Sequence, residues 1–485
     1  MRADVRSRIT SRLPMPVFDL GVLGVSAALA IAAAVLITVP EFSLAKFPLL
    51  AGVALATALL LPPTEFLVAS FLFFALLQLF ATYEYSAGPA NVFLSDLFLG
   101  TVVLRGFSPR DRVPMPGRLG TFTLGAFSVW AVFMVIAMAR GVSHGAPLDT
   151  VIRYASPLFY WPALYFGFSR VLRERDVDLN RLVRLIVVAG LALTAYMFLM
   201  RALNRPFEST DPTRGHLGEV TASSGHIFHR DFGFWSAFIV YPIVALIAAG
   251  KLLYSRRGEL AWLTVASVSI LATLMTLVRS EIYGLIAGLA VLFLLSKETL
   301  LDRTRQGTSS RLLRATMIGS VVLAVCAVLA AVNPGLAGVI GERSIPYYTH
   351  QSAAAKGNAE YRLSALERGV SVAGDHVAGL GVLSPTQLWE RGIDPELLVH
   401  SGPATLLVFL GWPGLIAAAL ALLGLMIDSS RAREGPWHPI LVGIIVMLVL
   451  NSFGAVGIVG QDFVMGIAAL IIALRFALFD SQRAE

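Results

Sequence analysis

Long apolar runs fill most of this chain, and they constrain its fold more than any other feature. Of its 485 residues, 56% are hydrophobic and only 14% are charged, whereas soluble domains carry roughly 25% charged residues. A helix needs about 20 apolar residues to cross a bilayer. The candidate runs cover residues 17–40, 46–61, 64–82, 93–106, 120–140, 149–172, 182–202, 232–250, 260–277, 280–296, 313–332, 401–427, 436–453 and 457–479. The sequence therefore predicts an all-α polytopic integral membrane protein with about 12–14 transmembrane helices.

The basic residues indicate how these runs are oriented. If all the runs cross and the N-terminus is cytoplasmic, the inward segments hold 25 of the 38 Lys and Arg residues. Short cytoplasmic loops carry such an excess of basic residues. We therefore expect a multi-pass protein of the cytoplasmic (inner) membrane with both termini in the cytoplasm. A cleavable signal peptide is not predicted, because the Arg-rich start at 1–12 precedes an apolar run without a clear small-residue cleavage site.

One long polar stretch, residues 333–400, interrupts the apolar pattern near the C-terminal end. The predicted orientation puts this stretch outside the cytoplasm, as a large loop between late helices. It divides the chain into a transmembrane bundle at 1–332 with about eleven spans, an extracytoplasmic loop at 333–400, and about three further spans at 401–485. Arg362, Leu366 and Gly369 recur at helical spacing, which predicts a short amphipathic helix at 358–372 within the loop.

Basic residues on the predicted outer side are the candidates for chemistry, because the orientation rule does not account for them. Arg279 lies in a tight turn between two apolar runs, where an Arg is costly unless it is paired or faces a polar cavity. It is either an interfacial Arg paired with Glu281 or a clamp for phosphate, whose oxygens match the guanidinium fork. Arg230 precedes the run at 232–250 and is either a second anion contact or part of a solvated loop end. No metal site is predicted, since spacing adds no third ligand to His226 and His229.

The end of the polar stretch holds the strongest candidates. His400 opens an apolar run, and an imidazole titrates near neutral pH, which suits a general base. The alternative for His400 is an interfacial residue that only caps the helix. Gly379 and Gly381 mark a tight turn in which the backbone bends or approaches another group. His376 belongs to the same turn, and a structural role there is the simpler interpretation.

In their order and spacing these residues resemble the O-antigen ligase and O-antigen polymerase superfamily. The resemblance covers roughly residues 225–425 and includes the turn Thr276-Leu277-Val278-Arg279-Ser280, Arg362, the segment 375–381, His400-Ser401-Gly402-Pro403 and Gly411-Trp412-Pro413-Gly414-Leu415. The chain departs from the family pattern in two places. Ser401 follows the loop His, where the family commonly has Asn, and Val377 and Ala378 stand where Pro and Leu are usual.

The resemblance implies a GT-C-type fold and a metal-independent inverting glycosyltransferase that uses no cofactor. Its donor would be a glycan on undecaprenyl pyrophosphate at the outer, periplasmic side, and its acceptor a hydroxyl on a glycan or a lipid-linked molecule. On this hypothesis His400 is the general base, and pyrophosphate is bound by Arg279 and Arg230, while Arg362 orients donor or acceptor. His376, Ser401 and Glu281 are supporting candidates. Membrane lipids and other polysaccharide-assembly proteins are the further partners expected.

Two rival hypotheses remain open at this point. A polymerase and a ligase share the donor and differ only in the acceptor. From another class, a transporter or flippase for lipid-linked glycans or other small molecules would place ionisable residues near the membrane midplane, whereas here the ionisable residues that the orientation rule does not explain collect at the predicted outer face. Nucleic-acid binding is not predicted, because the orientation of the membrane runs accounts for the inward basic charge.

Overall fold

The computed structural model describes part of the chain in detail. The described residues are 61–75, 84–87, 90–108, 121–174, 176–203, 219–221, 227–229, 238–254, 258–301, 353–395, 401–430 and 437–454, with single positions at 319, 320, 324, 327 and 331. The helices are α4 (Pro63–Ala75), α5 (Leu94–Phe107), α6 (Thr121–Ser143), α7 (Leu148–Val171), α8 (Leu179–Ala202), α9 (Val240–Tyr254), α10 (Glu259–Met275), α11 (Arg279–Leu301), α14 (Ala353–Asp375), α15 (Pro385–Glu390), α17 (Gly402–Ser430) and α18 (Trp437–Gly454). Two short antiparallel hairpins, β1 (Glu84–Ala87) with β2 (Ala90–Phe93) and β3 (Glu219–Thr221) with β4 (Ile227–His229), complete the described elements.

The predicted helical character is confirmed for these residues. Among the described residues, three helical segments are long and apolar enough to cross a membrane, namely 125–143 in α6, 180–202 in α8 and 402–424 in α17. Shorter apolar helices accompany them in α4, α5, α9, α10, α11 and α18. The runs predicted at 17–40 and 457–479, and most of those at 46–61 and 313–332, lie outside the described residues.

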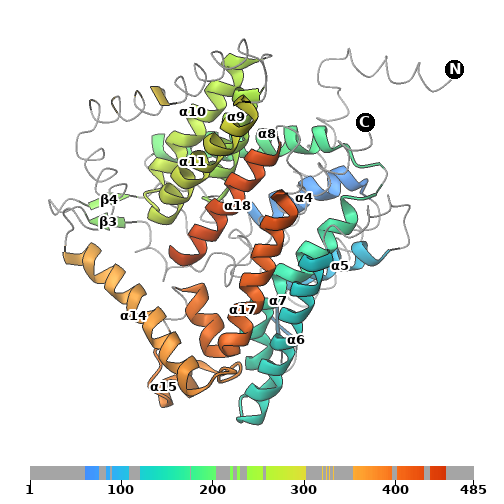
Figure 1. Cartoon of the computed structure of the whole chain (residues 1–485), viewed down its shortest axis with the longest axis vertical. Helices are drawn as coiled ribbons and strands as arrows, with labels where there is room; N and C mark the ends of the chain where they lie inside the picture. Colours follow the sequence, from blue (N-terminus) through green and yellow to red (C-terminus); the bar gives the residue numbers. More distant parts are fainter. Residues whose placement is uncertain are drawn as a thin grey trace.

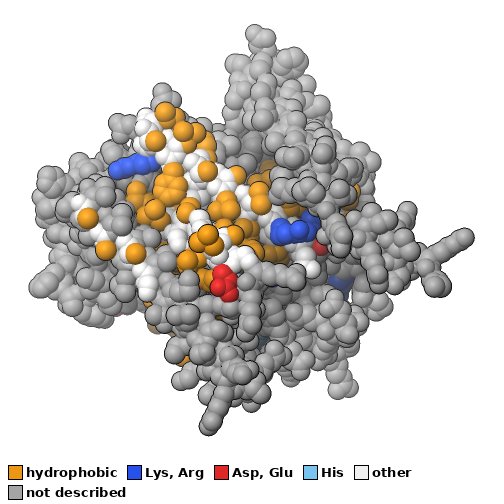
Figure 2. Space-filling model, turned by 90° about the horizontal axis from the view of Figure 1, so that it is seen from above, with side chains coloured by type: hydrophobic (Ala, Val, Ile, Leu, Met, Phe, Trp, Pro, Cys, Tyr) orange, Lys and Arg blue, Asp and Glu red, His pale blue; other side chains and the backbone are white. Residues whose placement is uncertain are grey.

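Apolar side chains are exposed on the described surface. Seen from above, its described part is mainly hydrophobic, with isolated charged side chains (Figure 2). Along α6, the exposed side chains include Val129, Val132, Val135 and Ile136. A soluble domain would cover such a stripe with polar side chains, so this face of α6 suits a lipid environment.

Close glycine contacts hold the upper helices together. In Figure 1, α9, α10, α11 and α18 gather in the upper part of the bundle. Gly288 of α11 faces Gly443 of α18 so closely that a Cβ on Gly288 would lie 2.9 Å from the Gly443 carbonyl oxygen. A Cβ on Gly284 would lie 2.9 Å from the side chain of Met447. Small residues at such positions let two helix backbones approach within van der Waals distance, and the pairing 284–447 and 288–443 makes α11 and α18 antiparallel.

The polar stretch also folds against the helices. The helix predicted at 358–372 is confirmed as α14, which is longer at both ends. In Figure 1, α14 and α15 lie at the lower left, beside α17. Gly369 of α14 packs on the first turn of α17, where an added Cβ would lie 3.1 Å from the Cα of Ala404. The described part of the stretch is therefore docked on the bundle.

Candidate functional site

A break in α17 is the centre of the candidate site. Gly411 has φ 68° and ψ −164°, and Pro413 follows two residues later. In a regular helix Val408 would accept a hydrogen bond from Trp412, and Phe409 from residue 413. Pro413 has no backbone N–H, and Trp412 donates elsewhere. Because Val408 and Phe409 are buried, their carbonyl groups need other donors.

Residues His376–Leu383, here called the docked turn, supply those donors. The backbone N–H of Leu380 donates to the Val408 oxygen at 2.8 Å, and that of Gly381 donates to the Phe409 oxygen at 3.1 Å. In return Trp412 donates to the Val377 oxygen at 3.0 Å. The segments 375–381 and 411–415, which the sequence marks separately, thus lie against each other and complete each other's backbone hydrogen bonds.

Glycine is required in the docked turn for two reasons. Gly379 and Gly381 have φ of 73° and 83°, a backbone region that residues other than glycine rarely adopt. A Cβ on Gly379 would also lie 2.5 Å from the Phe409 oxygen. The expectation of a tight turn with close backbone approach is confirmed.

The end of α6 forms the other wall of the docked turn. Arg140 donates from Nη1 to the carbonyl oxygens of Ala378 and Gly379, at 2.6 and 2.7 Å. His144 Nδ1 lies 3.0 Å from the Leu380 oxygen, and Val382 donates its backbone N–H to the Ala137 oxygen at 3.0 Å. Sequence interpretation missed this wall, because Arg140 and His144 give no local signal of a partner more than 230 residues away.

Replacing Gly141 by alanine should destabilise the protein by about 2 kcal/mol, although Gly-to-Ala changes inside helices ordinarily stabilise by roughly 0.5–1 kcal/mol. The sign reverses because a Cβ on Gly141 would lie 2.1 Å from the Val382 oxygen. Gly125 in the same helix is the matched control, since nothing lies within 4 Å of its Cβ, and Gly125→Ala should stabilise. Thermal unfolding of both variants in one detergent measures the difference. Equal shifts for the two would contradict tight docking at α6.

Two of the predicted site residues, His376 and Ser401, have described side chains in the docked turn and at the start of α17. His376 is exposed at the start of the docked turn, and its backbone N–H continues α14 by donating to Val372 at 2.8 Å. Ser401 is buried and caps α17, because its Oγ accepts from the Ala404 N–H at 3.3 Å. Ser and Asn are both strong N-cap residues, so an Asn at this position could form the same cap.

For the predicted base His400 and the three predicted arginines, the structure describes two backbone positions, those of Arg279 and Arg362. His400 and Arg230 lie outside the described residues. Arg279 is the first residue of α11. Arg362 lies in α14, seven residues before Gly369.

Glu281 has a partner that the sequence did not predict. It is fully buried in the first turn of α11, and Asn451 of α18 donates a hydrogen bond to its Oε1. Within the described part of the chain, Glu281 Oε2 and Asn451 Oδ1 have no hydrogen-bond partner. The preceding Leu277 has φ 53°, an uncommon conformation for this residue type. Asn451 was the available signal, since a lone Asn in an apolar run usually bonds to a neighbouring helix.

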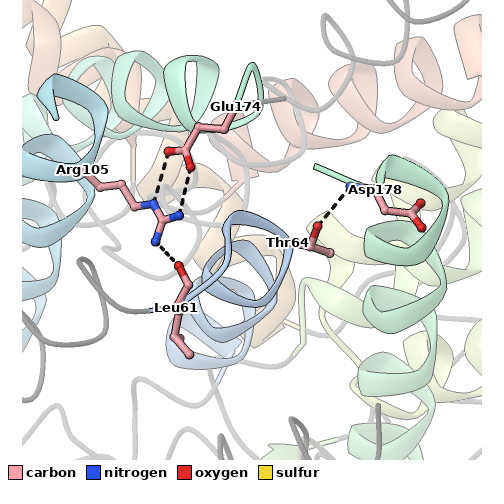
Figure 3. Close-up of polar contacts among 5 residues, drawn as sticks. All are labelled: Leu61, Thr64, Arg105, Glu174 and Asp178. Atoms are coloured by element: carbon pink, nitrogen blue, oxygen red, sulfur yellow. Dashed lines mark hydrogen bonds and ion pairs between the residues drawn. The ribbon is translucent and has the colours of Figure 1, made fainter. Parts of the chain in front are cut away.

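A second polar cluster lies at the far end of α7 (Figure 3). Arg105 of α5 donates to both carboxylate oxygens of Glu174, at 3.3 and 3.0 Å, and to the Leu61 oxygen at 2.7 Å. Its guanidinium also lies 4.6 Å from the ring centre of Phe66. Arg181 pairs with Glu65 at 2.8 Å. Since a helix of this length spans about 36 Å, these pairs are far from the docked turn and join α4, α5, α7 and α8.

Two further findings concern the metal-binding capacity of the described residues and the relatives of the chain. Among the described residues there is no group of three or more His, Cys, Asp and Glu side chains that could hold a metal ion. No protein-family model matches this chain, and no curated protein sequence matches it. The docked turn, which includes His376, thus binds Arg140 and His144 at the end of α6 and the break in α17.

Proposed function

We propose that this protein is a metal-independent inverting glycosyltransferase of the GT-C type. It moves a glycan from undecaprenyl pyrophosphate to an acceptor hydroxyl at the outer face of the cytoplasmic membrane, as an O-antigen polymerase or ligase does. One observation carries the proposal. The docked turn and the break in α17, two separate parts of the sequence pattern shared with that superfamily, are hydrogen-bonded to each other. In the sequence His400 directly precedes Ser401, whose side chain caps the start of the same helix, α17.

The proposed reaction is a single displacement. The acceptor hydroxyl attacks the anomeric carbon, the bond to the pyrophosphate oxygen breaks, and His400 takes the hydroxyl proton. Arg279 and Arg230 neutralise the charge that develops on the departing pyrophosphate, since preorganised cations stabilise such charge best in a dry site. Arg362 orients the donor or the acceptor from α14. Ser401 supports His400 by capping α17.

The proposed orientation has about 12–14 spans and both termini in the cytoplasm. The arrangement along α7 supports it. The Arg105–Glu174 pair at one end of α7 belongs to segments that the basic residues assign to the cytoplasm. The docked turn, beyond the other end of α7, belongs to the stretch assigned to the outer side.

Purified protein in lipid nanodiscs provides the test, with a labelled undecaprenyl-pyrophosphate oligosaccharide and a metal chelator present. We expect release of undecaprenyl pyrophosphate and inversion at the anomeric carbon of the product. Longer lipid-linked oligosaccharides would identify a polymerase, and transfer to an added lipid acceptor would identify a ligase. A protein that binds the donor but never breaks its sugar–phosphate bond, whichever acceptor is offered, would favour the transporter hypothesis.

A further inference from the structure

The geometry points to Arg140 as a positioning residue: by holding the docked turn against the break in α17, it sets the orientation of the α17 segment that follows His400. The catalytic part of this inference rests on the proposed function, in which His400 is the general base. The docking itself is a property of the fold and can be measured without any activity. Arg140 has no role in the sequence pattern of the superfamily that the chain resembles.

Arg140 makes an unusual contact. A single nitrogen, Nη1, donates to two successive carbonyl oxygens, those of Ala378 and Gly379. Both oxygens can face the same guanidinium because the positive φ of Gly379 reverses the chain there. Hydrogen bonds from a charged donor are roughly twice as strong as neutral ones, so Arg140 fixes the turn more firmly than a neutral side chain would.

Neighbouring contacts at the end of α6 fix the turn in one register. His144 Nδ1 lies 3.0 Å from the next carbonyl oxygen, that of Leu380. Gln387 of α15 donates to the His144 carbonyl oxygen at 3.3 Å. The space beside Gly141 is closed by the Val382 carbonyl group. Three successive carbonyl groups of the turn, at 378, 379 and 380, are therefore bonded to side chains of one helix end.

The turn passes this constraint on to α17. It supplies the donors for the buried carbonyl groups of Val408 and Phe409, which the break leaves without helical partners. The segment 402–410 is separated from the rest of α17 by Gly411, so the docked turn constrains the angle between the two parts of the helix. The same segment carries the Ser401 cap and the Ala404 contact with α14. The start of α17, with the Ser401 cap, is thereby positioned from α6.

Arg140→Ala should lower kcat for glycan transfer by about 100-fold, because a displacement of about 1 Å can cost this much. KM for the donor should change less than about 3-fold, since no substrate contact is removed. Arg140→Lys should recover activity to within about 10-fold of wild type, because an ammonium group can still donate to both carbonyl oxygens. Arg368→Ala is the matched control. Arg368 also donates to a carbonyl oxygen, that of Gly392 at 3.0 Å, but only within the polar stretch.

Hydrogen exchange of the purified proteins, followed by mass spectrometry of the peptide that covers 376–384, tests the docking directly. In Arg140→Ala we expect the amides of Leu380, Gly381 and Val382 to exchange at least ~10-fold faster than in wild type, while Arg368→Ala exchanges them as wild type does. Faster exchange together with the loss in kcat, in Arg140→Ala alone, supports the inference.

The unfavourable outcomes separate the two proposals. Unchanged exchange in Arg140→Ala would overturn the docking role whatever the activity. Faster exchange with wild-type kcat would overturn the positioning role and leave the glycosyltransferase proposal intact. If the wild-type protein transfers no glycan, the proposed function fails and the catalytic part of this inference fails with it, while the exchange result still decides whether Arg140 holds the turn.

Discussion

Replacing His400 by alanine should lower the rate of glycan transfer by about 10²–10⁴-fold, which is the factor that general-base catalysis typically supplies. The acceptor hydroxyl would then have to lose its proton to water during the attack. Pyrophosphate is a good leaving group and needs no general acid, so the loss reports on the missing base. The measurement is the single-turnover rate of undecaprenyl pyrophosphate release, with donor and acceptor both saturating.

Two further variants, His376→Ala and Ser401→Asn, test whether the loss of activity is specific to His400. His376 is exposed in the docked turn, and His376→Ala should change the rate less than about 3-fold, since exposed residues away from the chemistry tolerate substitution. Ser401→Asn should also keep most of the activity, because Asn caps a helix as well as Ser does. All three proteins should insert and unfold like wild type. Transfer by His400→Ala at the wild-type rate would remove His400 from the role of base.

The local elements of this fold follow from the sequence because each depends on residues close together in the chain. The apolar runs predict the helices, and helical spacing around Arg362 predicts α14. Gly379 and Gly381 favour a tight turn, and Pro413 favours a break in a helix, because of their own backbone chemistry. None of these residues indicates that the turn donates hydrogen bonds to the carbonyl groups at the break. That follows only when α14 packs on α17 and brings the two segments within hydrogen-bond distance.

Long-range polar partners could not be predicted for the same reason. Glu281 has a nearby cation in the sequence, yet its hydrogen-bond partner in the structure is Asn451, 170 residues away. The basic-residue rule assigns Arg105 to the inward side, and that assignment gives no indication of its ion pair with Glu174. The composition of a loop fixes the side of the membrane on which it lies, whereas the partner of each charge depends on which helices are neighbours.

Breaking the Arg105–Glu174 pair should cost about 3–5 kcal/mol of folding free energy, because removing one partner leaves a buried charge without its counter-ion. Arg105→Ala also removes the donor to the Leu61 oxygen and the contact with Phe66. Arg184→Ala is the matched control. Arg184 is exposed on α8 near the same end of the bundle and, among the described residues, donates only to the Asn180 carbonyl oxygen of its own helix, so its loss should stay within about 0.5 kcal/mol. Denaturant titration in one detergent measures both.

A double replacement, Arg105→Met with Glu174→Leu, makes this pair informative about function. Apolar residues of similar volume often replace a buried ion pair without loss of stability, so the double variant should unfold close to wild type although each single variant does not.

A transporter has to open both ends of its bundle in turn, and an ion pair that seals one end would be part of its cycle. A glycosyltransferase acts at one face and needs the far end only to stay closed. We therefore expect the double variant to keep wild-type glycan transfer. If it folded normally but lost function, the far end of the bundle would have to take part in the cycle, and the transporter hypothesis would gain.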